Sequence, residues 1–185
     1  MKLKSILSSL AIFFLAQCVF AQEKMIQLED IWASRTFSPE WVRGINSMND
    51  GIHYSSLNYG DKNVYITEYS YETGDSISTI VDSKDLDGIS FSDYSFSEDE
   101  KKVLLPTETE SIYRYSSRSN YYVYDRETKI AEELSEGKQR LAQFSPDASK
   151  VAFVKENNIF IKDIINNTEL QVTFDGEINK IINGA

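Results

Sequence analysis

A segment of ten residues recurs in this chain at an offset of 48 residues. The first copy, FSEDEKKVLL, runs from Phe96 to Leu105, and the second, FSPDASKVAF, runs from Phe144 to Phe153. Both copies have an aromatic residue and a serine, then turn-forming residues, then lysine, valine and further apolar residues. A repeat of this kind indicates structural units that each have an apolar face covered only by a neighbouring unit.

The repeat extends beyond this segment. NYYVYDRETKIAEEL (120–134) matches NIFIKDIINNTELQV (158–172), and a third copy lies upstream in GIHYSSL, NVYITEY and SISTIV. These short runs are rich in β-branched and aromatic residues and are separated by turn signals such as NDG and ETGD. Four short strands per repeat are typical of β-propeller blades. We therefore predict an all-β fold, an incomplete β-propeller over residues 37–185, with blades at about 37–83, 87–136 and 139–174.

Three blades do not make a closed propeller, which has about four or more. An open stack of three leaves two apolar sheet faces uncovered. We therefore expect the chain to be the N-terminal piece of a longer protein or a truncated gene product. The alternative is a self-contained β-sandwich.

The N-terminus has the organisation of a secretory signal peptide. Two lysines precede an apolar run over residues 6–15, and Val19 and Ala21 are small residues in front of a cleavage point. We predict a signal peptide over residues 1–21 and a secreted or periplasmic protein. A buried N-terminal helix is the alternative.

Cys18 is the only cysteine. A lipoprotein signal would carry lipid on Cys18, but the preceding Gln17 is larger than such signals normally allow. Cleavage after Ala21 leaves no cysteine, which excludes disulfides, thiol catalysis and cysteine-based metal sites. The next residues, 22–36, form a lead-in segment that we expect to be a short amphipathic helix or a strand.

The net charge of the chain is −10, and it is −12 without the two lysines of the signal peptide. Such a surface repels phosphate backbones, so we do not expect nucleic acid as a partner. No apolar run after the signal peptide is long enough to predict a transmembrane segment. The acidic turns lack the ligand spacing of a calcium loop, so no metal or other cofactor is expected.

The second blade contains an insertion. From Val151 to Phe160, across the central hairpin of the third blade, is nine positions, whereas from Val103 to the equivalent Tyr122 is nineteen. The ten extra residues predict an elongated hairpin that projects over one face of the propeller. Loops converge at the faces of a propeller, and ligands bind there.

The insertion carries Tyr113, Arg114, Tyr115 and Arg118. The planar guanidinium of an arginine held between tyrosines can bind a carbonyl or carboxylate group through two hydrogen bonds. A solvated hairpin whose charges serve solubility is the alternative. His53 is the only histidine and alternates with apolar residues in a strand, so we interpret it as structural or surface-exposed rather than catalytic.

With these features, the sequence resembles the amino-terminal part of dipeptidyl peptidase IV, a serine exopeptidase of the prolyl oligopeptidase type. The resemblance rests on DYSFSEDEKKVLL, YRYSSRSNYYVYD, FSPDASKVAFVKENNIFIKD and TFDGEINKIINGA, in that order and spacing. It implies an eight-bladed propeller over an α/β-hydrolase domain. It also implies that Arg114 binds carbonyl or carboxylate oxygens of the peptide substrate, with Arg118 as the second choice.

The resemblance further implies an enzyme that releases Xaa-Pro or Xaa-Ala dipeptides from peptides. The catalytic Ser, Asp and His would lie in a C-terminal hydrolase domain missing from these residues, which contain no G-x-S-x-G motif. The family commonly dimerises, so a homodimer is a candidate assembly. The other hypotheses are an exported, non-enzymatic module that binds peptides or glycans, and a gene fragment without function.

Overall fold

The computed structural model describes residues 25–39 and 44–184. The chain divides into two compact units, residues 1–41 and 42–185. The predicted signal peptide (1–21) with Cys18, and the first residues of the predicted lead-in segment, lie outside the described residues. These assignments therefore stay predictions.

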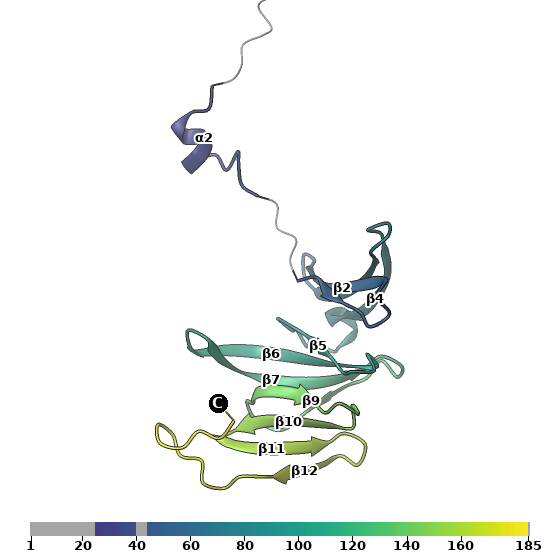
Figure 1. The fold of residues 1–185 in the computed structure, drawn as a ribbon, viewed down its shortest axis with the longest axis vertical. Coiled ribbons are helices and arrows are strands. Elements are labelled where there is room, and N and C mark those ends of the chain that lie inside the picture. The colour runs from purple at the N-terminus through teal and green to yellow at the C-terminus, as the bar shows by residue number, and fades with distance from the viewer. Residues whose placement is uncertain (1–24, 40–43, 185) are drawn as a thin grey trace, which may run out of the picture. The chain divides into compact units, whose positions relative to one another are not determined.

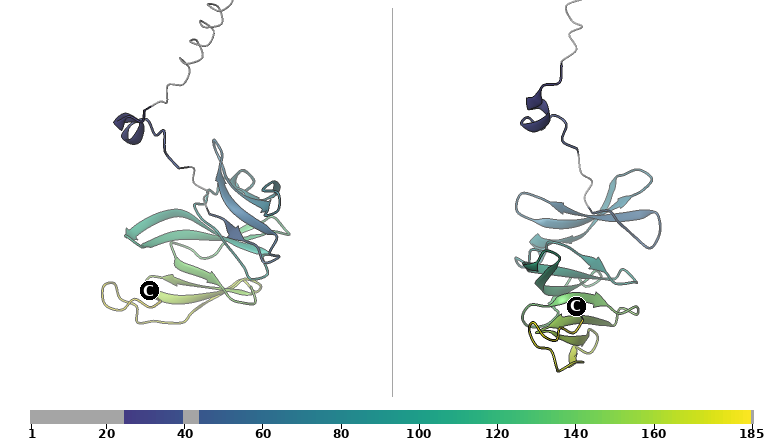
Figure 2. Two further views of the ribbon diagram at one scale, coloured as in Figure 1. Left: turned by 45° about the horizontal axis from the view of Figure 1, so that its top comes forward. Right: turned by 60° about the vertical axis from the view of Figure 1, so that its left-hand side comes forward.

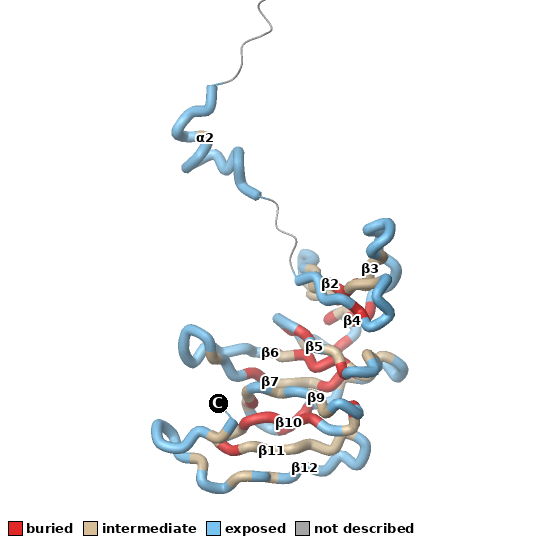
Figure 3. The backbone as a smooth tube through the Cα atoms, in the orientation of Figure 1, coloured by how far each residue is buried: buried red, intermediate tan, exposed pale blue. Residues whose placement is uncertain are grey.

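In the described part of the first unit, the structure has the short helix α2 (Leu28–Trp32). Of the two alternatives for the lead-in segment, the structure has the helix. The backbone N–H of Gln27 donates to the Asp30 carboxylate at 2.9 Å, which gives the first turn one of the hydrogen bonds of a capping box. No residue of α2 is buried (Figure 3).

The second unit consists of three four-stranded antiparallel sheets that follow one another in chain order (Figures 1 and 2). Each sheet is a meander, in which strands adjacent in sequence are hydrogen-bonded neighbours. The prediction of an incomplete β-propeller with three blades is confirmed. The strands of the first blade are β1 (Asn46–Ser47), β2 (His53–Tyr59), β3 (Val64–Ser70) and β4 (Ser76–Asp82), followed by the 3-10 helix η2 (Ser83–Asp85); those of the second are β5 (Ser95–Phe96), β6 (Lys102–Tyr113), β7 (Ser116–Asp125) and β8 (Ala131–Glu133); those of the third are β9 (Arg140–Phe144), β10 (Lys150–Lys155), β11 (Asn158–Asp163) and β12 (Thr168–Gln171).

The alternation of side chains along β6 explains how the second blade packs on both sides. Val103 and Leu105 point into a core shared with the first blade, which includes Ile66 and Val81. Leu104, between them, points the other way into a core shared with the third blade. Successive side chains of a strand face opposite sides of a sheet, so one run of apolar residues serves two interfaces.

The segment after β12 is attached to the turn between β10 and β11. The buried side chain of Asn158 accepts hydrogen bonds from the backbone N–H of Gly176 at 2.9 Å and from the Thr173 hydroxyl at 3.1 Å. The backbone N–H of Asn183 donates to the Asn157 carbonyl at 3.0 Å. A Cβ atom at position 176 would collide with the Asn157 carbonyl, so glycine allows this close approach. These bonds hold residues 176–183 beside the third blade.

Candidate functional site

The hairpin of β6 and β7 is the longest of the three central hairpins. Val103 pairs with Tyr124 across it, whereas the equivalent Val151 pairs with Lys162 in the third blade. The loop enclosed by the first pair is ten residues longer, as the sequence predicted. We call the added part, residues 108–118, the arm.

Arg114 and Tyr115 form the two-residue turn at the tip of the arm, between the paired residues Tyr113 and Ser116. The side chain of Arg114 is exposed, and it has no hydrogen-bond or ion-pair partner in the described part of the chain. The rings of Tyr113 and Tyr115 are 74% and 94% exposed, and neither makes a cation–π contact with Arg114 among the described residues. The guanidinium is therefore free to take an acceptor from outside the chain.

Arg118, the second choice from the sequence, is engaged within the arm. Its Nε donates to Glu110 Oε2 at 2.9 Å across the strand pair, and both side chains are about half exposed. It lies within β7. Of the two arginines, Arg114 is the one whose guanidinium is unoccupied.

The base of the arm is attached to the connection between the second and third blades. The backbone groups of Ser119 and Gln139 exchange two hydrogen bonds of 2.9 and 2.8 Å. The Nζ atom of Lys138 donates to the carbonyl of Glu108 and lies 3.2 Å from Glu110 Oε1. Sequence reasoning missed Lys138, because a lysine in a connecting loop gives no signal of its contacts.

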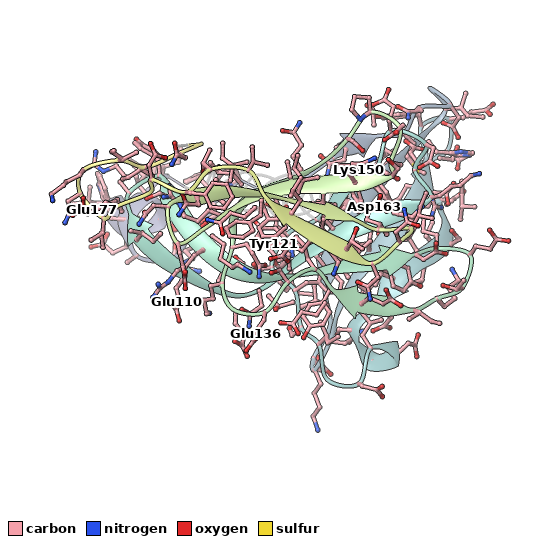
Figure 4. All side chains as sticks on the ribbon, turned by 90° about the horizontal axis from the view of Figure 1, so that it is seen from below. Glu110, Tyr121, Glu136, Lys150, Asp163 and Glu177 are labelled. Carbon is pink, nitrogen blue, oxygen red and sulfur yellow. The ribbon has the colours of Figure 1, made fainter. Side chains whose placement is uncertain are left out.

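A cleft of about 760 Å³ lies beside the arm. It is large enough for a small ligand or a few residues of a peptide. Figure 4 shows Glu110 and Glu177 at the same end of the unit, with Lys150 and Asp163 at the other end. Arg114 itself does not line the cleft. The lining comes from the arm (Glu110–Tyr113 and Arg118), the connection between the blades (Glu136, Gly137, Lys138 and Arg140), the third-blade hairpin (Val154–Asn157) and the C-terminal segment (Ile178, Asn179 and Ile182).

Arg140, at the start of β9, is a second arginine at this cleft that sequence reasoning missed. Its Nε atom is buried and has no hydrogen-bond partner among the described residues. Lys155, which also lines the cleft, is fully engaged: it donates to Ser135 at 2.7 Å and to Glu169 at 2.9 Å. No hydrophobic pattern or spacing marks Arg140, since its position depends on how the third blade packs.

His53 has structural neighbours. Its Nδ1 atom lies 2.5 Å from Asp50 Oδ2, in the turn between β1 and β2, and 3.5 Å from Glu68 Oε1 in β3. The backbone N–H groups of Ile52 and His53 lower the pKa of Asp50, with the Ile52 bond the larger cause. Among the described residues, the polar contacts of the imidazole are with these two carboxylates, one of which holds a turn, which agrees with the structural interpretation of His53.

Within the described ranges, no three His, Cys, Asp or Glu side chains are grouped closely enough to hold a metal ion. Nor does any helix in the described part of the chain have the length and apolar character needed to cross a membrane.

The fold and the arm define the class of protein. Three consecutive four-stranded blades, one of which extends its central hairpin beside a cleft, form part of a β-propeller with a candidate ligand site at one face. Comparisons with known proteins identify the type of propeller.

Residues 97–185 match the family model of the dipeptidyl peptidase IV (DPP IV) N-terminal region. The chain is 33% identical over 168 residues to the prolyl endopeptidase FAP of Homo sapiens, an alignment that covers 87% of this chain and 20% of that protein. It is 34% identical over 141 residues to the probable dipeptidyl-aminopeptidase B of Tuber melanosporum (strain Mel28), covering 72% of this chain and 15% of that protein. The crystal structure of Porphyromonas gingivalis dipeptidyl peptidase 4 matches with a TM-score of 0.71 and 39% identity, covering 85% of this chain and 23% of that chain.

The chain carries an N-terminal propeller region of the dipeptidyl peptidase IV type. The resemblance inferred from the order and spacing of its motifs is thereby confirmed. The chain spans 15–20% of the length of these curated relatives.

Proposed function

We propose that this region belongs to an exported serine-type dipeptidyl peptidase and that Arg114 anchors its peptide substrate. The observation that carries the proposal is the free guanidinium at the tip of an arm that adjoins a cleft. The names of the relatives, which are peptidases, support the same function. The propeller region would also gate the path by which peptides reach the catalytic centre.

The chemistry of a guanidinium suits this role. Its planar N–H groups form paired, charge-assisted hydrogen bonds to a carbonyl or carboxylate group. Bound in this way, a peptide is held in one register, so that cleavage occurs two residues from its amino terminus. The contribution of Arg114 is therefore to orientation rather than to bond breaking.

Bond breaking would fall to a Ser-Asp-His triad in an α/β-hydrolase domain of the same protein. There the serine attacks the peptide carbonyl, and an oxyanion hole stabilises the intermediate. The expected substrates are peptides with proline, or less readily alanine, as the second residue. A homodimer is the proposed assembly of the complete enzyme.

The test is Arg114→Ala in the complete protein, assayed with an Xaa-Pro chromogenic substrate. Loss of a charge-assisted hydrogen bond costs about 1.5–3 kcal/mol, so kcat/KM should fall about 10- to 150-fold. Lys101→Ala is the matched control, because it removes an exposed positive charge from the turn between β5 and β6. An unchanged kcat/KM for Arg114→Ala would exclude this residue as the anchor.

Two further measurements address the remaining parts of the proposal. Sequencing the encoding DNA past the codon for Ala185 should reveal a frame that continues to a G-x-S-x-G motif; a stop codon directly after Ala185 would argue against a peptidase.

Amino-terminal sequencing should show that the exported protein begins at Gln22. A protein retained inside the cell with Met1 intact would contradict export.

A further inference from the structure

The arm reaches beyond the sheet that supports the rest of its hairpin. Its residues from Glu108 to Tyr115 are all exposed, so almost no apolar packing fixes its direction. The last backbone pair that ties the hairpin to the next blade is Ser119 with Gln139, at the base of the arm. The contacts that tie the arm to other segments are polar: those of Lys138, and a hydrogen bond of 3.1 Å between the Thr109 and Ser92 hydroxyls.

Two irregularities in β6 make the direction of the arm sensitive to local contacts. The register shifts between Thr107 and Glu110 and again between Ser111 and Tyr113. Glu108, in the first of these bulges, has a φ of 46°. A bulge bends its strand and increases the local twist, so the two shifts re-aim everything that follows them.

Lys138 contacts the arm at the first bulge. The Nζ atom donates to the backbone carbonyl of Glu108, lies 3.2 Å from Glu110 Oε1 and lies 3.9 Å from Glu108 Oε2. The Lys138 side chain is only 21% exposed. Lys138 lies in the connection that leads into β9, so it joins the arm of the second blade to the beginning of the third.

The polar contacts at the base of the arm differ in strength. The ion pair of Glu110 with Arg118 is about half exposed on both sides, and such pairs contribute little to stability. The bond from Lys138 to the Glu108 carbonyl is charge-assisted, and because its acceptor belongs to the backbone it constrains the main chain directly. Lys138 and, next in size, Arg118 also lower the pKa of Glu110 through their hydrogen bonds, which favour its charged form.

We infer that Lys138 is a positioning residue, which fixes the arm at Glu108 and thereby sets where Arg114 stands relative to the cleft. The inference deepens the proposed function, because its kinetic consequence depends on Arg114 as the substrate anchor. The geometric part, that Lys138 orients the arm, is independent of what Arg114 binds.

The geometric part is tested by the distance between two spin labels on the full chain. Labels are placed at Tyr115→Cys, at the tip of the arm, and at Thr168→Cys, an exposed position in β12, with Cys18→Ser removing the native cysteine. Lys138→Met should broaden the distance distribution, because the arm loses its contact at the bulge. Lys101→Met, the loss of an exposed lysine elsewhere, should leave the distribution narrow. A distribution as narrow in Lys138→Met as in the parent chain overturns the inference.

The kinetic part uses the complete enzyme without labels. Lys138→Met should lower kcat/KM about 5- to 10-fold, as expected for one lost hydrogen bond, through KM rather than kcat. Lys138→Arg, whose guanidinium can still donate to the Glu108 carbonyl, should restore most of the loss. Glu110→Gln should have the smaller effect, since it leaves the carbonyl bond in place. If Glu110→Gln matches Lys138→Met, the carbonyl bond does not orient the arm and the inference fails.

The two proposals can fail separately. A broadened distance distribution with an unchanged KM would support Lys138 as the residue that orients the arm and count against Arg114 as the anchor. A narrow distribution together with a strong effect of Arg114→Ala would overturn the role of Lys138 and leave the anchor intact.

Discussion

The second and third blades each have one aspartate that organises the turn between the first two strands of the blade, β5 and β6 or β9 and β10, and the two do so in the same way. Asp99 and Asp147 each accept a hydrogen bond of 2.6 Å from the hydroxyl of the serine two residues earlier. Each also accepts a backbone N–H from the residue two positions later, at 3.2 Å from Lys101 and 3.1 Å from Ser149. These bonds favour the charged form, and they lower the pKa of both carboxyls, that of Asp147 to about 2.

The lowered pKa of Asp147 predicts a pH-dependent contribution to stability. The folded pKa is about 2 against an ordinary value of 3.8, so the charge stabilises the fold above pH 3.8 and this is lost as the pH falls towards 2. Asp147→Asn should lower the urea midpoint at pH 7. Below pH 4, the difference in urea midpoint between the variant and the parent chain should become smaller.

Asp61→Asn serves as the control for this prediction. Asp61 is exposed and has no hydrogen-bond or ion-pair partner within the described ranges. Its replacement should leave the midpoint unchanged at both pH values. A difference for Asp147→Asn that stays constant from pH 7 to pH 3 would mean that its charge is not what stabilises the turn.

At the scale of elements, the three central hairpins differ chiefly in how they turn. The third blade closes with two residues, Glu156 and Asn157, both at positive φ (50° and 62°), as in the tight turns that match the twist of a hairpin. The second blade replaces this turn with the arm. Thr107 pairs with Asn120 at the position where Lys155 pairs with Asn158, so the arm is an insertion into an otherwise equivalent hairpin.

This equivalence predicts that the arm can be removed without unfolding the blade. Replacing residues 108–119, which are the arm and the adjoining Ser119, with the dipeptide Glu-Asn of the third-blade turn should lower Tm by only a few degrees. The deleted residues are exposed except for Ser116, which is half-buried, and Ser119, which is buried. Peptidase activity of the complete protein should fall at least as far as with Arg114→Ala. A collapse of the circular dichroism spectrum would show that the arm is needed for folding.

At the scale of the whole second unit, stability depends on two apolar interfaces between blades. The first joins the first and second blades around Ile66, Val103 and Leu105, and the second joins the second and third blades around Leu104 and Val151. The second blade is therefore buried on both faces. On the third blade, Leu170 and other apolar side chains remain exposed.

Leu104 offers the sharpest test of the second interface, because it is 1% exposed. Leu104→Ala should lower the free energy of unfolding by about 2–5 kcal/mol, through lost burial and the cavity left behind. Leu170→Ala is the matched control, since the same atoms are removed from a side chain that is 64% exposed. Denaturant unfolding measures both. Equal effects of the two substitutions would mean that the interface between the second and third blades does not stabilise the chain.

Much of this architecture could be predicted from the sequence because its signals are local. Alternating apolar residues and glycine- or asparagine-rich turns mark the strands, and strands adjacent in sequence also pair in space. Counting residues between equivalent positions located the arm and placed Arg114 on it. The prediction did not extend to the contacts of the arm, since Lys138 lies 30 residues from Glu108 in the chain.

The sequence by itself therefore determined the blades, their order, the length of the arm and the presence of Arg114, because each depends on spacing along the chain. Only the tertiary structure decided that Arg118 forms an ion pair with Glu110, that Lys138 donates a hydrogen bond to the Glu108 carbonyl at the bulge, and that a cleft lies beside the arm. Those features depend on register shifts within β6 and on packing between blades. Neither leaves a periodic trace in the sequence, since each is set by contacts between residues far apart in the chain.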